Sequence, residues 1–341
     1  MYVLLKHIFY YACKFLGIFR WYRYKQKESV IILTYHSVVP KIPRGLNAFE
    51  YRNCITPEQF EEQIKFLLRY YKPVNIDNVL NNDLTAFNKG FIITFDDGFK
   101  NNCTLAMPIL KKYGLQGCFF VTTGLIGKNE MLWTEKITYL LFNTQKSKVK
   151  VKLAHWHTLD LHSSGAREKV SWLILDYLKA SNKNKITSTI KQLQLQLDDV
   201  QEPDENLKGE RYTFMDWDDV KKLVENGQIV GSHTHNHEIV STLNPEQSKD
   251  EIEKSRCLLS ERIDIACKYF SYPNGARGDF NETHKKQLKD AGYAGAFSQI
   301  PGLNLPNTDP YELRRMNIEN MSMITFEATT SGFRYNLKGE I

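Results

Sequence analysis

Paired cysteines are missing from this chain. Its 341 residues include six cysteines, and no two of them have the Cys-x-x-Cys spacing, which argues against zinc-ribbon and thioredoxin-like redox sites. Low-complexity runs are also absent, and 42% hydrophobic and 25% charged residues are ordinary for a globular protein. Cys103 and Cys118 lie in apolar stretches, so we expect them to be small buried side chains.

A strong charge of either sign is lacking as well. The formal net charge of +6 is compatible with an anionic surface or an envelope polymer, but it is too small to indicate a nucleic-acid partner. The charge is unevenly placed, however. Residues 1–27 contain six lysines and arginines and no acidic residue before Glu28.

Residues 1–27 also lack a long hydrophobic run, because Lys6 and Lys14 interrupt each apolar stretch. A membrane-spanning helix is therefore a poor interpretation. Basic and aromatic residues together favour a helix lying on an anionic membrane surface, and a helix packed on the protein body is the alternative. We see no small-residue cleavage site, so we expect the protein in the cytoplasm or peripherally at the inner membrane.

From residue 29 onward, short apolar stretches alternate with amphipathic ones. Strands are predicted over 30–35, 91–95 and 117–121, and a capping box opens a helix predicted over 56–70. Six or more such units indicate a parallel (β/α) barrel rather than an open sheet. The expected fold class is thus α/β, a distorted (β/α) barrel.

One region interrupts this alternation. Residues 128–212 are rich in lysine, glutamine and asparagine and contain amphipathic helical stretches. We interpret them as a helical insertion that caps one face of the barrel. The predicted organisation is a basic aromatic segment, 1–28, followed by one catalytic domain, 29–341, that carries this insertion.

The stretch FIITFDDG runs a predicted strand directly into two acids, Asp96 and Asp97. Adjacent buried carboxylates repel each other, so a positive group must neutralise them. Without a metal, we expect one of the two to be protonated near neutral pH. A plain turn is the alternative reading, because aspartate and glycine favour turns.

A histidine cluster, GSHTHNH, follows a second apolar stretch, 228–230. His233 and His237 lie four residues apart, so one turn aims both at a common point, whereas His235 points elsewhere. One aspartate and these two imidazoles would hold a divalent cation, leaving the other aspartate as a base. The HxHxDH hydrolases have an aspartate where this chain has His237, and amidohydrolase barrels have their HxH on the first strand, whereas this cluster follows the acidic pair.

Together, TFDDG and HTHNH resemble the first two motifs of the NodB-type polysaccharide deacetylases, from about residue 29 to 320. The resemblance implies a distorted (β/α) barrel and metal-dependent hydrolysis of N-acetyl groups on amino sugars. It also implies that Asp96 is the general base and that Asp97, His233 and His237 hold the metal. Zinc is expected, with cobalt, nickel or manganese as alternatives.

The third motif departs from the common Arg-Pro-Pro-Tyr-Gly pattern. Here the matching stretch is FSYPNG, residues 270–275, with Ser271 in the place of the arginine. This form is similar to the branch that deacetylates poly-N-acetylglucosamine. The likeness assigns Tyr272 and the backbone amide of Asn274 to the oxyanion or substrate, and Arg315 becomes the candidate for the missing tether of the base.

The resemblance also leaves the general acid open, because no histidine follows His284. The early stretch LTYHSV, at a predicted strand end, resembles the early Tyr-His motif that takes this role in the poly-N-acetylglucosamine branch. The resemblance therefore implies that His36 protonates the departing amine, and a hydrogen-bonded histidine at the barrel mouth is the alternative. His284 lies in a lysine-rich helical stretch and is expected to be solvated.

The predicted function is therefore a metal-dependent hydrolase that releases acetate from an N-acetylated glycan or polysaccharide. Two alternatives remain. One is a catalytically impaired carbohydrate-binding or assembly protein, favoured by the missing arginine, and the other is a metal amidase acting on a non-sugar amide.

Overall fold

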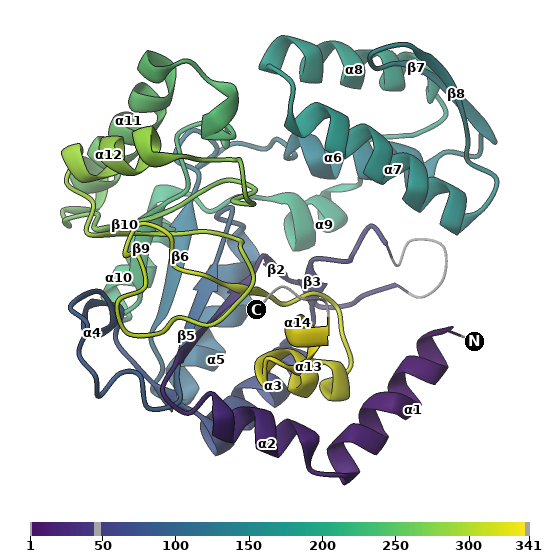
Figure 1. Ribbon diagram of the computed structural model, residues 1–341. Coiled ribbons are helices and arrows are strands. Elements are labelled where there is room, and N and C mark those ends of the chain that lie inside the picture. The colour runs from purple at the N-terminus through teal and green to yellow at the C-terminus, as the bar shows by residue number, and fades with distance from the viewer. Residues whose placement is uncertain (1, 44–48, 338–341) are drawn as a thin grey trace.

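A parallel β-sheet lies at the centre of the protein (Figure 1). The computed structural model describes residues 2–43 and 49–337. The strand order is β11-β10-β9-β6-β5-β1-β12, every pairing along it is parallel, and β4 adds to β5. The strands are β1 (Val30–Tyr35), β4 (Lys72–Pro73), β5 (Gly90–Phe95), β6 (Gly117–Val121), β9 (Ile229–Ser232), β10 (Tyr269–Ser271), β11 (Gly295–Phe297) and β12 (Met316–Asn317).

The two ends of this sheet approach each other through a single segment. Phe297 of β11 forms a parallel bridge with Leu313, and Met316, three residues later, pairs with Leu33 of β1. Residues 313–317 therefore span the gap between β11 and β1, and the sheet curves into a distorted barrel. The predicted α/β fold of this type is confirmed.

Complete burial explains why the strands read as continuous apolar runs. Every residue of β1, β5 and β6 is buried, as expected for parallel strands with helices on the outside. Inside the core, the rings of Phe95 and Phe119 stack with centroids 4.6 Å apart. The covering helices are α3 (Pro57–Tyr70), α4 (Ile76–Leu80), α5 (Met107–Lys112), α10 (Trp217–Glu225), α11 (Pro245–Ile263) and α12 (Glu282–Asp290).

Capping residues set the beginnings of several of these helices. The Thr56 hydroxyl accepts a hydrogen bond from the backbone N–H of Gln59, and the Gln59 side-chain oxygen accepts one from the backbone N–H of Thr56, which is the predicted capping box. Asn244 forms the same arrangement at the start of α11. A π-helical turn, Asn102–Ala106, precedes α5, and short strands β2 (Ser37–Val38) and β3 (Cys54–Ile55) pair beside the barrel.

The insertion forms a unit with a hydrophobic cluster of its own, separate in Figure 1 from the sheet. It is not purely helical as predicted, because β7 and β8 form an antiparallel hairpin. The sequence KVKVK alternates exposed lysines with buried Val149 and Val151, a period of two that favours a strand. The elements are α6 (Trp133–Asn143), β7 (Lys148–Lys152), β8 (Trp156–Asp160), α7 (Ser164–Lys179), α8 (Lys183–Gln196), α9 (Glu205–Leu207) and a π-helical turn (Lys208–Tyr212).

The N-terminal segment forms two helices, α1 (Tyr2–Phe15) and α2 (Ile18–Lys25). Gly17 between them has a φ of 75°, a left-handed conformation that glycine adopts without strain. They pack against α13 (Met323–Thr330) and α14 (Phe333–Leu337), as Figure 1 shows. Among the described helices, none combines the length and the hydrophobicity required to cross a membrane.

Candidate active site

The predicted catalytic residues gather at the carboxyl end of the sheet. His36 directly follows β1, Asp96 and Asp97 follow β5, and His233 follows β9. Because parallel strands end at the same edge of a barrel, residues far apart in sequence meet there. Arg315 reaches the same point from the position just before β12.

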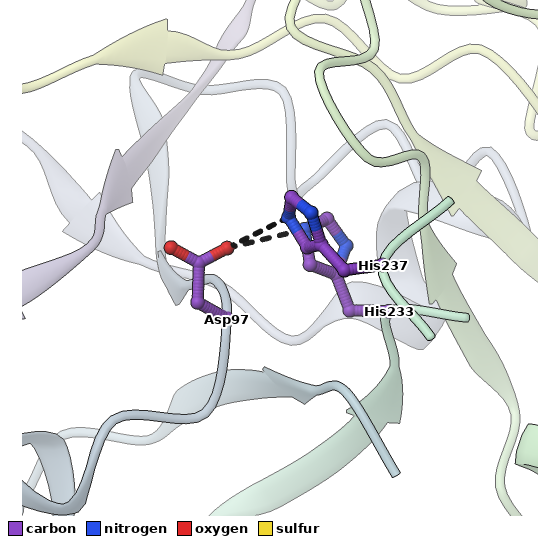
Figure 2. A group of neighbouring side chains, drawn as sticks. All are labelled: Asp97, His233 and His237. Carbon is purple, nitrogen blue, oxygen red and sulfur yellow. Dashed lines mark hydrogen bonds and ion pairs between the residues drawn. The ribbon is translucent and has the colours of Figure 1, made fainter. Parts of the chain in front are cut away.

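Asp97, His233 and His237 form a compact group (Figure 2). The Nε2 atoms of His237 and His233 lie 3.2 Å and 3.5 Å from Oδ1 of Asp97, and one ligand atom from each residue lies within 4.8 Å of the others. The two imidazole rings are 5.0 Å apart between centroids. The structure thus brings together the three residues predicted to share a cation.

Unusual backbone conformations hold this group in place. Asp97 and His237 have φ values of 75° and 60°, which are uncommon for residues other than glycine. Within the histidine loop, the Glu251 carboxylate accepts hydrogen bonds from the backbone N–H groups of His235 and Asn236, at 2.9 Å and 2.7 Å. This buried acid fixes the loop, so its conformation does not depend on the histidine side chains alone.

The donor set fits a divalent cation. Nδ1 of His233 donates to the backbone carbonyl of Ser271 at 2.8 Å, so Nε2 is the ring nitrogen that faces Asp97 and would bind a cation once it has lost its proton. One carboxylate and two imidazoles match the open ligand sets of catalytic zinc and related metals. His235 turns away as predicted, with its Nδ1 2.9 Å from the Thr123 hydroxyl.

Asp96 is neutralised by a buried arginine. The Arg315 guanidinium is fully buried and donates to both Asp96 carboxylate oxygens, at 2.8 Å and 2.7 Å. It also donates to the Ser271 hydroxyl at 2.7 Å. Ser271 and Gln299 donate further hydrogen bonds to Asp96, each at 3.2 Å. The contact expected of a tether is therefore present, made by Arg315 from another strand.

This arrangement changes the expected charge of the carboxylates. Burial alone would raise the pKa of Asp96, but the Arg315 guanidinium and then His233 outweigh it and hold that pKa below its usual value. Burial likewise opposes ionisation of Asp97, yet hydrogen bonds from His233 and His237 bring its pKa well below normal. The prediction that one aspartate is protonated near neutral pH without metal is wrong, because it left out these partners.

The remaining predicted residues divide into two groups. His36 and Asn274 line the same cleft as Asp96 and the histidines, and Nδ1 of His36 is buried without a partner among the described residues. Tyr272 does not reach the cleft: its side chain is fully buried, stacks on Phe280, and donates its hydroxyl to the Tyr311 carbonyl. His284 is buried rather than solvated, and its Nδ1 accepts from the Asn281 N–H.

The cleft has a volume of about 280 Å³ and receives one wall from the insertion. Trp133 and Glu135 of α6 and Trp172, Leu175 and Lys179 of α7 line it. No local pattern marks Glu135, Trp172, Leu175 and Lys179 as wall residues, because their placement depends on how the insertion folds back. Gln299 could have been suggested by its position just after an apolar strand, as the other mouth residues were.

Comparisons with known proteins agree with this geometry. The sequence profile of the family "Polysaccharide deacetylase" matches residues 85–296, more than half of the chain. The chain belongs to this family of deacetylating hydrolases. A curated Bacillus subtilis (strain 168) protein, YxkH, named as a provisional polysaccharide deacetylase, is 21% identical over 302 residues, covering 87% of this chain and 74% of that protein.

Two solved structures share the fold. IcaB from Ammonifex degensii superposes with a TM-score of 0.57 at 17% identity, covering 90% of this chain and 98% of that one. Streptococcus pyogenes deacetylase PplD, solved in complex with acetate, gives a TM-score of 0.56 at 17% identity, covering 89% and 98%. At these identities the likeness establishes a shared fold.

We predict that His237→Ala weakens zinc binding by at least about 100-fold, because even loss of an outer partner of a metal ligand costs about 10–100-fold. Metal content after dialysis against graded zinc buffers measures this change. His235→Ala is the matched control, since this histidine lies in the same loop but turns away from the group. Equal zinc content in the two variants would contradict the ligand assignment.

We predict that Arg315→Met lowers the free energy of unfolding by about 3–5 kcal/mol, because it leaves the buried Asp96 carboxylate without its main partner. Arg314→Met is the control, since that neighbouring side chain is only half-buried and makes no ion pair with another described residue. Urea unfolding of both variants provides the comparison. Equal midpoints would show that the Asp96–Arg315 pair contributes little.

Proposed function

We propose that the protein hydrolyses N-acetyl groups on amino sugars of a glycan or polysaccharide, releasing acetate and leaving a free amine. The observation that supports this most directly is the shared cleft. An ionised, arginine-braced Asp96 and the Asp97–His233–His237 group face the same space, as a base and a metal site must for amide hydrolysis. The family membership gives the class of bond.

Asp97, His233 and His237 are the residues that would hold the cation. When bound, a divalent cation supplies Lewis acidity, which polarises a carbonyl oxygen and lowers the pKa of a water molecule. We propose zinc, because imidazole and carboxylate ligands with an open coordination position suit it. Cobalt, nickel and manganese are the alternatives, since the same ligands can also bind them.

Asp96 acts as the base in this proposal. It accepts a proton from the attacking water, whose oxygen adds to the acetyl carbon. Arg315 orients both carboxylate oxygens and keeps the carboxylate charged between turnovers. Arg315 is thus a positioning residue, while Asp96 contacts the reacting water.

The oxyanion and the leaving nitrogen need separate donors. The backbone N–H of Asn274 makes no hydrogen bond within the described residues, and its residue lines the cleft, so it is free to donate to the developing oxyanion. Gly275 allows this turn, since a Cβ there would lie 2.9 Å from backbone atoms of Tyr272 and Gln299. His36 then gives a proton to the nitrogen as the carbon–nitrogen bond breaks.

A poly-N-acetylglucosamine-like polymer is the finer substrate proposal. It is supported by the Tyr-Pro-x-Gly form of residues 272–275 and by the early Tyr-His pair ending at His36. The missing arginine that favoured a catalytically impaired carbohydrate-binding protein has a counterpart in Arg315, so that observation no longer favours it. A non-sugar amide substrate is tested by the same assay.

We predict that Asp96→Asn lowers the turnover number by about 10²–10⁴-fold, because removal of a general base has an effect of this size, while zinc stays bound. The assay measures acetate released from N-acetylglucosamine oligomers with and without added zinc or cobalt. Asp218→Asn, on the exposed first turn of α10, is the control. Acetate release by Asp96→Asn at the wild-type rate would refute the base assignment.

Acetate release from a non-sugar amide, with none from any glycan, would instead refute the substrate class. Absence of release from every substrate by the zinc-loaded wild-type protein would refute the enzymatic proposal itself.

A further inference from the structure

The cleft has a positively charged wall that the proposed reaction does not use. Arg52, which precedes β3, and Trp172 and Lys179 on α7 all line the cleft together with His233 and His237. The Arg52 guanidinium lies 5.3 Å from the Trp172 ring centroid, and the Lys179 ammonium lies 5.8 Å from it. One aromatic ring therefore carries two cations.

The positive charges of Arg52 and Lys179 are only weakly neutralised by carboxylates of the protein. Arg52 is stacked on Phe49, 4.6 Å from its ring centroid, and forms no ion pair with a described carboxylate. Among the described residues, Lys179 forms an ion pair with Asp176 alone, at 3.7 Å, and the Asp176 side chain is largely exposed; Asp279 acts on Lys179 without forming an ion pair. Burial lowers the pKa of both cations, and for Lys179 the repulsion from Arg52 adds to this.

Glu135 and Glu319 line the same cleft and raise the pKa of Arg52, but neither forms an ion pair with it. Glu135 is engaged by Arg211, at 2.5 Å, and Glu319 lines the cleft without forming an ion pair to Arg52. Partly desolvated cations without a close anion are unfavourable unless a ligand supplies the anion. Carboxylates and phosphates are the groups that arginine and lysine bind best.

We propose that Arg52, Trp172 and Lys179 form a subsite for an anionic group, a carboxylate or a phosphate, carried by the glycan beside its N-acetylated sugar. This inference rests on the proposed function. It narrows the substrate class from neutral amino-sugar polymers to acidic or phosphorylated ones, with Trp172, 40% exposed, as the aromatic platform beside the anion.

The test compares Lys179→Gln with Lys183→Gln, a control at the exposed start of α8. Acetate release is measured on N-acetylglucosamine oligomers that are neutral, carry a uronate, or carry a phosphate. We expect the wild-type protein to prefer an anionic oligomer, measured as the ratio of kcat/KM for the anionic oligomer to kcat/KM for the neutral one. In Lys179→Gln we expect this ratio to be about tenfold lower. Uronate and phosphate arms distinguish the two anions.

A binding measurement keeps this test separate from turnover. Inorganic phosphate and glucuronate are titrated calorimetrically into the wild-type protein and both variants. Binding lost in Lys179→Gln and kept in Lys183→Gln supports the subsite, even if no oligomer is deacetylated and the proposed function fails. Equal preference and equal anion binding in both variants would overturn it.

A second, independent observation concerns the outer face of α1. Leu5, Ile8, Phe9, Phe15 and Leu16 recur every few residues along one side and are half to nine-tenths exposed, with Phe15 at 92%. The other side is packed, because Tyr10 and Cys13 bury against the cluster that contains Phe333. The helix α1 lies at the edge of the molecule (Figure 1), and its apolar stripe is exposed to solvent.

The next helix, α2, carries exposed basic and aromatic side chains. Arg20, Lys25, Trp21 and Tyr24 are exposed, and Lys25 lies 5.4 Å from the Trp21 ring centroid. Lys14 and Arg23 are paired with Glu327, so they anchor the helices instead. Symmetric pairing of two copies through this face would bring like charges together, whereas an anionic lipid surface matches both the stripe and the cations.

We infer that α1 and α2 bind an anionic membrane surface peripherally, with the apolar stripe entering the headgroup boundary. Flotation with phosphatidylcholine vesicles, with and without phosphatidylglycerol, tests this. We expect the protein to bind only the anionic vesicles and to be released by high salt. The Phe15→Ser/Leu16→Ser double variant is expected to partition at least about tenfold more weakly, because it lacks two apolar side chains that would be buried in the membrane.

The control is Leu195→Ser, since Leu195 is equally exposed on the insertion, far along the chain from α1. Equal flotation of the double variant and the control would overturn the inference. So would a concentration-dependent dimer in the absence of lipid, by light scattering, that the double variant abolishes.

Discussion

Two adjacent carboxylates at the end of β5 must be compensated before the barrel can bury them, and the site is built around that compensation. Asp96 turns to one side and is neutralised by the buried Arg315, while Asp97 turns to the other and faces two imidazoles. Ionising both would otherwise oppose burial. The structure thus gives two carboxylates of the same chemistry different surroundings, which suit the proposed roles of Asp96 as base and Asp97 as metal ligand.

The loops around the cleft have left-handed backbone conformations at several residues. Asp97, His237 and Asn274 all have positive φ values, and each belongs to a segment that places a polar group at the cleft. Strained backbone of this kind persists only where the surroundings fix it. Here Glu251 holds the histidine loop, and the Asp279 carboxylate accepts from the Asn274 side chain at 2.5 Å.

The insertion supplies one wall of the cleft. The barrel supplies the proposed base, metal ligands and oxyanion donor, whereas α6 and α7 supply an aromatic and cationic wall. The barrel part of the cleft therefore rests on one hydrophobic cluster, and the wall from the insertion rests on another. The helices α1 and α2, proposed to face a membrane, form a third unit with a hydrophobic cluster of its own.

Local sequence determined the strands, the capped helices and the Asp97–His233–His237 group. The group was predictable because the strand ends of a parallel barrel converge and because two histidines four residues apart can point toward the same place. Tertiary structure alone decided that Arg315 reaches Asp96, that Tyr272 is buried, and that α7 lines the cleft. Those outcomes depend on contacts between segments far apart in the chain, which no local pattern encodes.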